Sequence, residues 1–323
     1  MSIVKGNNDQ EPSELLDRSD SRVTHTDGVA SSMRAFFESV RSGDLGSLPV
    51  VVGLVVIWTV FTIINPIFLS PNNLVNLLFD CATVGVISLG IVCVLMLGEI
   101  DLSVGSMSGV GSALLGVLWV NQGVPLFFAI GAALCVGAAI GVIYALLRTK
   151  MGMPSFVSTL AGLLALLGFQ LFLLGSTGSI NLPYGSEFVN FGQLMVMPDW
   201  VSHSFALIPG VVIFVMGVKA RNQRQQAKLS ASSFGRILFK AITITCALEI
   251  VVVYLNLGRG VPWMFGVFIL LVVIMDYALT RTKWGRSMFA VGGNAEAARR
   301  AGINVRKVYM SAFILCATLA TLG

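Results

Sequence analysis

The sequence predicts an all-α protein that crosses a membrane many times. Of its 323 residues, 55% are hydrophobic and only 11% are charged, whereas about a quarter of the residues in an average soluble domain are charged. Apolar runs follow one another along the chain, and most of them reach the roughly 17 to 25 residues that a helix needs to span the hydrocarbon core. The predicted fold class is therefore a polytopic transmembrane helical bundle.

The apolar runs lie at residues 49–69, 74–97, 104–120, 124–147, 155–174, 204–218, 238–257, 261–280 and 308–323. We predict eight full membrane helices and an incomplete ninth, and a transmembrane domain that covers 48–323. The ninth run reaches Gly323 with no polar anchor behind it. We therefore expect a chain that is cut short at its C-terminus.

Residues 1–47 are predicted to form a cytoplasmic tail. Its first 30 residues are rich in Asp, Glu, Ser and Asn, a composition that buries too little apolar surface to become ordered. An amphipathic helix that lies in the membrane interface is expected at about 31–42. Its apolar side consists of Met33, Phe36, Phe37 and Val40. We interpret this helix as an elbow that leads into the first membrane helix, with a regulatory contact as the alternative.

The basic residues predict the orientation of the chain. If the N-terminus is cytoplasmic and the helices alternate, 20 of the 21 Lys and Arg residues lie inside and only Arg259 lies outside, as the positive-inside rule requires. These residues are dispersed over separate segments, so nucleic-acid binding is not expected. The basic loop 219–240 is expected to hold its flanking helices against the anionic headgroups of membrane lipid.

A second basic loop, 281–307, contains seven Lys or Arg residues and predicts one short helix. Asn294 can cap its N-terminus, and Glu296 lies at the positive end of the helix dipole. Arg299 lies near the negative end, and Gly302 suits a left-handed C-cap. Because a helix of two turns is too short to be stable alone in water, we expect it to dock onto a cytoplasmic protein.

Two acidic residues, Glu99 and Asp101, interrupt the apolar sequence just before Ser103 and a helix of small residues. A carboxylate at the bilayer centre costs about 2.5 to 3.5 kcal/mol on insertion scales, so such groups face a bundle interior or a water-lined cavity. These three residues are candidates for the wall of a polar translocation pathway. The alternative is that Asp101 or Ser103 simply caps the following helix.

Three further residues are candidates for the same pathway. Glu249 lies near the middle of its apolar run, with no basic residue close to it in the sequence. Ser155 and Ser158 lie in the first turns of a predicted helix, where a hydroxyl can bond to a helix carbonyl or contact a polar solute. The glycine pairs 105/109 and 137/141 are expected to let helix backbones approach closely.

Several classes of function are not expected. The chain has no G-x-x-x-x-G-K-[ST] motif and no Gly-Lys dipeptide, so it cannot cradle nucleotide phosphates by that route. Its five cysteines lie in apolar runs without a C-x-x-C pairing, and its two histidines do not complete a Ser/His/Asp set. We therefore expect no enzyme activity, no cofactor, no metal site and no disulfide.

Five sequence strings resemble the permease subunits of bacterial ABC sugar importers of the ribose, galactose and xylose class. They are G-E-I-D-L-S-V-G-S-M at 98–107, P-S-F-V-S-T-L-A-G at 154–162, R-G-V-P at 259–262, W-G-R at 284–286 and A-V-G-G-N-A-E-A-A-R-R-A-G-I-N-V at 290–305. The resemblance covers roughly residues 49–323. The extra basic loop and the helix at 238–257 make the xylose permeases the nearest in likeness.

The resemblance implies that 281–307 is the coupling loop, which contacts a separate ATPase subunit. The residues it assigns to this contact are Gly293, Asn294, Glu296, Ala297, Ala298, Arg299 and Gly302. It further implies a second copy of the permease, an external sugar-binding protein, and a multi-pass location in the bacterial inner membrane.

The predicted function is the import of xylose or a related pentose, driven by ATP hydrolysis on the ATPase subunit. Two alternatives stay open. The chain could be a proton-coupled secondary transporter or facilitator, in which Glu249 or Asp101 exchanges protons, or it could be a truncated membrane scaffold that transports nothing.

Overall fold

The computed structural model describes residue 46 and residues 48–323. The predicted tail and its interfacial helix lie outside the described residues. Within the described part, all regular secondary structure is helical, which confirms the predicted all-α class. One isolated antiparallel bridge joins Val196 and Pro262.

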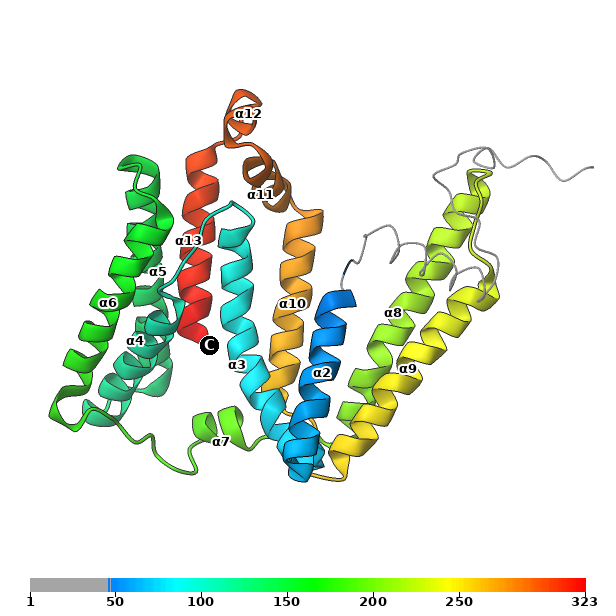
Figure 1. Cartoon of the computed structure of the whole chain (residues 1–323), viewed down its shortest axis with the longest axis horizontal. Helices are drawn as coiled ribbons and strands as arrows, with labels where there is room; N and C mark the ends of the chain where they lie inside the picture. Colours follow the sequence, from blue (N-terminus) through cyan, green and yellow to red (C-terminus); the bar gives the residue numbers. More distant parts are fainter. Residues whose placement is uncertain (1–45, 47) are drawn as a thin grey trace, which may run out of the picture. The chain divides into compact units, whose positions relative to one another are not determined.

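The helices correspond to the apolar runs of the sequence (Figure 1). The long ones are α2 (Leu48–Ile64), α3 (Pro71–Leu95), α4 (Val104–Gly116), α5 (Leu126–Lys150), α6 (Ser155–Leu174), α8 (Asp199–Gln226), α9 (Phe234–Asn256), α10 (Trp263–Arg281) and α13 (Val305–Leu322). The short elements are η1 (Pro66–Leu69), the π-helical turn η2 (Val117–Asn121), η3 (Gly175–Thr177), α7 (Glu187–Gln193), α11 (Lys283–Gly293) and α12 (Ala295–Arg300).

Eight of the helices in the described part are long and apolar enough to cross a membrane. This confirms the predicted transmembrane character of the chain. The run at 308–323, predicted to be incomplete, overlaps α13, which is one of the eight. Helix α2 is an apolar helix of 17 residues.

The described chain divides into two compact units. The first unit contains α2, η1, the first turn of α3, α8 and α9. Helices α8 and α9 pack against each other along their length (Figure 1). The Tyr254 hydroxyl of α9 donates a hydrogen bond of 2.9 Å to the Leu69 carbonyl of η1, which ties this helical pair to the turn after α2.

The core of the second unit forms around α13, which packs against α4 and α5. Gly137 and Gly141 of α5 allow this approach, because a Cβ on Gly141 would lie 2.6 Å from the Phe313 carbonyl oxygen. The packing predicted for this glycine pair is thus confirmed. Gly109 also packs closely, against Gln170 of α6, but Gly105 faces open space, so the close approach predicted at Gly105 is wrong.

Helices α11 and α12 lie at the end of the second unit where α10 finishes and α13 begins (Figure 1). The Thr282 hydroxyl caps α11 by accepting a hydrogen bond of 3.2 Å from the Gly285 amide. The Trp284 indole donates to the Ser311 hydroxyl of α13 at 2.8 Å, and Met288 and Val291 are buried in the core. These contacts hold α11 against α13 and fix the point from which α12 projects.

Candidate functional site

The segment between α3 and α4 is non-helical and carries the acidic residues predicted for the pathway. Side chains from the start of α6 satisfy its backbone. The Ile100 amide donates to Ser155 Oγ and the Leu102 amide donates to Thr159 Oγ1, both at 3.2 Å. Lipid cannot satisfy exposed peptide groups, so irregular backbone at membrane depth must be buried in protein or line a cavity. The hydroxyls of Ser155 and Thr159 on α6 provide the hydrogen-bond acceptors for two of these amides.

Asp101 is buried at the centre of this segment. Its Oδ1 accepts hydrogen bonds from the Ser103 amide at 2.8 Å and from the Ser103 hydroxyl at 2.7 Å. Its Oδ2 lies 3.8 Å from the Sγ of Cys316, which belongs to the middle of α13. Ser103 is at the N-cap position of α4, but its hydroxyl bonds to Asp101 and makes no cap bond to the helix, so the predicted side-chain cap by Ser103 is wrong.

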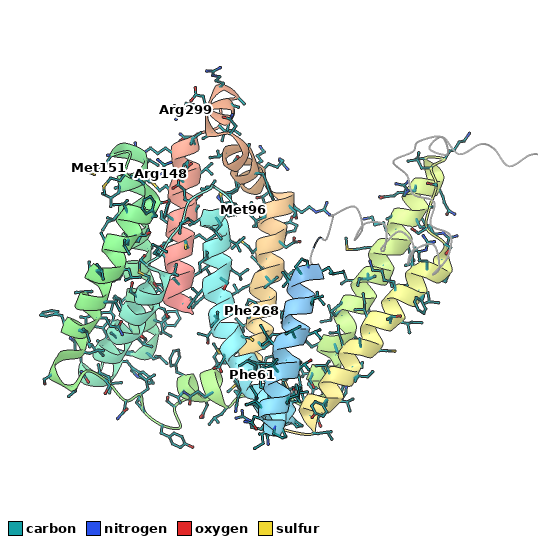
Figure 2. The ribbon with its side chains drawn as sticks, in the orientation of Figure 1. Phe61, Met96, Arg148, Met151, Phe268 and Arg299 are labelled. Carbon is teal, nitrogen blue, oxygen red and sulfur yellow. The ribbon has the colours of Figure 1, made fainter. Side chains whose placement is uncertain are left out.

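Glu99 forms an ion pair with Arg148 from the last turn of α5. The Arg148 Nε lies 2.6 Å from the Glu99 Oε1, with 8% of the Glu99 side chain and 34% of the Arg148 side chain exposed. The Arg148 guanidinium also lies over the Tyr309 ring of α13, 5.5 Å from its centroid. Arg148, labelled in Figure 2, thus joins the acidic segment to the start of α13.

Five of the six residues predicted for the pathway come together in the second unit. Ser155 bonds to the acidic segment directly, and the Ser158 hydroxyl donates to the Ser155 carbonyl at 2.9 Å. The other three are Glu99, Asp101 and Ser103, and all five are buried. Sequence reasoning did not assign roles to Thr159 and Arg148, although Thr159 lies in the same string of hydroxyl residues as Ser155 and Ser158.

Glu249, the sixth predicted residue, belongs to the first unit. Its Oε2 lies 2.6 Å from the Nδ1 of His203. His203 lies in α8 and contacts Glu249 across the helical pair. Because 46 positions separate His203 from Glu249 along the chain, the sequence did not predict this pair.

Both predicted caps of α12 are confirmed. The Asn294 side-chain oxygen accepts hydrogen bonds from the amides of Glu296 at 3.0 Å and Ala297 at 2.9 Å. At the other end Gly302 has a φ of +83°, a conformation that favours glycine. The Ile303 amide then bonds back to the Ala298 carbonyl at 3.0 Å, which closes the C-terminus in the way typical of a left-handed cap.

Helix α12 has an inner and an outer side. Ala298 is 5% exposed and belongs to the hydrophobic core of the second unit. Glu296 and Arg299 are exposed and form an ion pair of 3.3 Å. Figure 2 labels Arg299 on α12, at the end of the second unit. Surface pairs of this kind stabilise a helix by less than about 1 kcal/mol. From the sequence we expected this short helix to be stabilised by docking onto a partner protein. The burial of Ala298 in the core of its own chain already supplies part of that stabilisation.

A recess of about 480 Å³ lies between α12 and the ends of α5 and α13. Three arginines line it, Arg148, Arg299 and Arg306, together with the Tyr309 ring. The exposed side of α12 and this recess form one basic surface. We call it the α12 surface, defined by Glu296, Ala297, Arg299, Arg300 and Arg306.

The second unit thus combines helices of membrane length with a polar, non-helical segment and a short helix, α12, that is capped at both ends. The chain belongs to the family described as the permease component of the branched-chain amino acid transport system, which matches residues 73–323.

Its relatives include sugar permeases. The xylose transport system permease protein XylH of Escherichia coli K12 is 32% identical over 289 residues, which are 86% of this chain and 70% of that protein. XylH of Haemophilus influenzae is 28% identical over 285 residues, 88% of this chain and 75% of that protein. The ribose import permease protein RbsC of Escherichia coli K12 is 26% identical over 277 residues, 84% of this chain and 66% of that protein.

No solved structure matches the chain. The relatives and the family together confirm the resemblance to permease subunits of ABC sugar importers.

Proposed function

We propose that this chain is the membrane-spanning subunit of an ATP-driven importer for xylose or a related pentose, with its N-terminus in the cytoplasm. The observation that carries the proposal is α12, a short helix capped at both ends and exposed on its outer side, in a chain whose family consists of transport permeases. The names of the XylH relatives support xylose. A second permease copy, an external sugar-binding protein and membrane lipid are the further partners we propose.

The α12 surface is our proposed contact with the ATPase subunit. Ala297 is exposed there, and its small side chain leaves room for a partner to approach the helix closely. Gly293 and Asn294 shape the entry into α12, and Gly302 shapes its exit. These residues would set the angle at which the helix meets the ATPase.

The charge of the α12 surface indicates what the partner should carry. Its basic residues outnumber its single acid, Glu296, and the adjoining recess contains Arg148 as well. Complementary charges steer association and make it sensitive to ionic strength. We therefore expect an acidic surface on the ATPase, and an association that weakens as salt increases.

We further propose that Glu99, Asp101, Ser103, Ser155 and Ser158 lie along the translocation pathway. All five are buried. Glu99 and Ser155 bond to other segments of the second unit, and Asp101, Ser103 and Ser158 bond to residues two or three positions away. A pathway whose polar groups bond to one another is closed to solute, so transport would require these bonds to be exchanged. A role for Glu249 on the pathway stays a prediction, because its partner His203 belongs with it to the first unit.

The experiment that tests this function is affinity purification of the full chain from its own cells in mild detergent. An ATP-hydrolysing subunit should come with it. Ala297→Trp should abolish this association, since it places a large ring on the outer side of α12 while leaving the buried Ala298 unchanged. Ala227→Trp, a matched change at an exposed position after α8, should leave the association unaffected. Equal recovery of the ATPase with both variants would contradict the proposal.

A further inference from the structure

One buried hydroxyl of the second unit, that of Tyr144, has no hydrogen-bond partner among the described residues. Tyr144 lies in α5, is 4% exposed and belongs to the hydrophobic core of the unit. Burying a hydroxyl without a partner is costly, and such a group in a folded protein calls for an explanation. The surroundings of the Tyr144 hydroxyl supply one.

The Tyr144 hydroxyl lies beside the acidic segment between α3 and α4. It is near the side chains of Ser103 and Asp101 but bonds to neither of them. Tyr144 precedes Arg148 by one turn of α5, so the two side chains share a face of the helix, and Arg148 pairs with Glu99 of the same segment. Helix α5 therefore meets the acidic segment at two points, of which only one is bonded.

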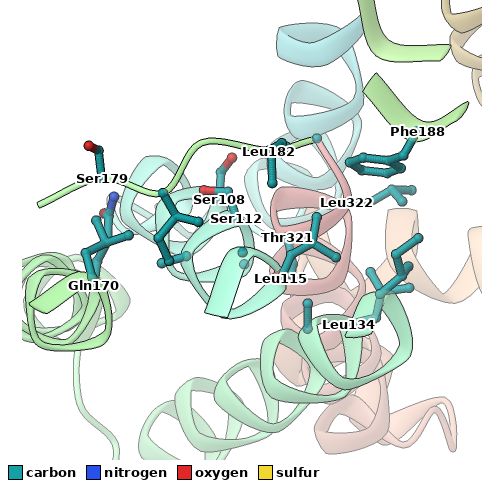
Figure 3. Close-up of a pocket in the computed structure, with 18 of the residues that line it drawn as sticks. Ser108, Ser112, Leu115, Leu134, Gln170, Ser179, Leu182, Phe188, Thr321 and Leu322 are labelled. Atoms are coloured by element: carbon teal, nitrogen blue, oxygen red, sulfur yellow. The ribbon is translucent and has the colours of Figure 1, made fainter. Parts of the chain in front are cut away.

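Gly162 of α6 makes room for the Tyr144 hydroxyl, because a Cβ at this position would collide with it. Other polar side chains of α4 and α6, among them Ser108 and Gln170, face a cavity whose walls do not include Tyr144 (Figure 3). The Tyr144 hydroxyl is thus enclosed between α5, α6 and the acidic segment. An enclosed donor gains a partner when a neighbouring acceptor moves toward it.

Asp101 is an acceptor that can take a further donor. Its Oδ1 already accepts hydrogen bonds from the amide and the hydroxyl of Ser103. Its Oδ2 lies 3.8 Å from the Cys316 thiol, which is a weak donor. A tyrosine hydroxyl is a stronger donor than a thiol, so Tyr144 is suited to bond to this carboxyl group.

We propose that Tyr144 is a positioning residue of the transport cycle, and that its hydroxyl donates a hydrogen bond to Asp101 when Asp101 releases the Ser103 hydroxyl. The inference rests on the proposed function and extends it by naming the group to which one bond of the closed pathway is transferred. The exchange gives the buried carboxyl a hydroxyl donor in both arrangements of the segment, which avoids the cost of leaving it without one.

The first test is thermal unfolding of the purified full chain in detergent, with and without Ser103→Ala. Tyr144→Phe alone removes a hydroxyl that has no partner, so the unfolding midpoint should stay unchanged or rise slightly. With Ser103→Ala, Asp101 loses its present hydroxyl donor and bonds to Tyr144 instead. Adding Tyr144→Phe should then lower the midpoint by about 2 to 4 °C.

Tyr277→Phe, at a 64% exposed position of α10, is the matched control and should leave the midpoint unchanged in both backgrounds. If Tyr144→Phe alone lowers the midpoint as much as it does together with Ser103→Ala, or if it lowers neither, Tyr144 does not replace Ser103 and the proposal is overturned.

The second test is uptake of radiolabelled D-xylose by cells that contain the complete importer. Tyr144→Phe should slow uptake about tenfold without reducing recovery of the ATPase subunit, whereas Tyr277→Phe should change neither. Uptake at the unchanged rate with Tyr144→Phe overturns the role in transport. If the unchanged chain neither recovers an ATPase nor supports uptake, the proposed function fails and the transport role fails with it. The unfolding measurements decide separately whether Tyr144 can bond to Asp101.

Discussion

The ion pair between Glu99 and Arg148 offers the sharpest test of how the acidic segment is held. Arg148→Ala removes the guanidinium and leaves the Glu99 carboxylate, 8% exposed, without its 2.6 Å partner. It also removes the cation that lies over the Tyr309 ring. The segment between α3 and α4 should then lose the attachment to α5 and to the start of α13 that Arg148 provides.

The size of the effect follows from burial. Removing one partner of a fully buried ion pair destabilises a protein by about 3 to 5 kcal/mol. The Arg148 side chain is 34% exposed, so water reaches the site and reduces the loss. We expect about 2 to 3 kcal/mol for Arg148→Ala, in line with hydrogen bonds to charged groups.

The assay is thermal unfolding of the purified chain in detergent, arranged as a double-mutant cycle. Arg148→Ala and Glu99→Gln are measured alone and together. The double variant should be less destabilised than the sum of the single variants, because the buried carboxylate that Arg148→Ala strands is then neutral. If the two effects add, or if Arg148→Ala leaves the unfolding midpoint unchanged, the pair does not hold the segment.

Three further predictions concern single contacts. Thr159→Val removes the acceptor of the Leu102 amide and should lower the stability of the second unit by about 1 to 3 kcal/mol, whereas Thr159→Ser should retain most of it; equal unfolding midpoints would count against this bond. Gly141→Leu should prevent α5 from packing on α13 and reduce the yield of folded protein, while Gly105→Leu, at a site with open space around it, should fold normally; equal yields would refute the packing. Asn294→Ala should cost α12 about 1 kcal/mol and speed hydrogen exchange at Glu296 and the next amide, and unchanged exchange would contradict the cap.

Features that depend on neighbouring residues could be predicted from the sequence. The membrane helices follow from the apolar runs, and both caps of α12 follow from Asn294 and Gly302, because these signals act within a few residues. The predicted close packing at Gly137 and Gly141 is correct, and in the structure both glycines lie on the side of α5 that faces α13.

Features that depend on tertiary packing could not be predicted. Arg148 lies 49 positions from Glu99, and His203 lies 46 positions from Glu249, so only the fold brings each pair together. Gly105 has the same spacing pattern as Gly137, yet it faces open space, because spacing does not specify which side of a helix meets a neighbour.

The central claim is that α12 binds an ATPase subunit in the cytoplasm. The most direct test of this claim is to determine on which side of the membrane α12 lies. Ala297→Cys and Tyr184→Cys provide one probe on α12 and one on the 91% exposed Tyr184 position of the opposite loop. Intact and lysed spheroplasts are treated with a membrane-impermeant maleimide and compared with the chain that has only its native cysteines. We predict that the cysteine at 297 reacts only after lysis and that at 184 reacts in intact cells. Labelling at 297 in intact spheroplasts would contradict the account.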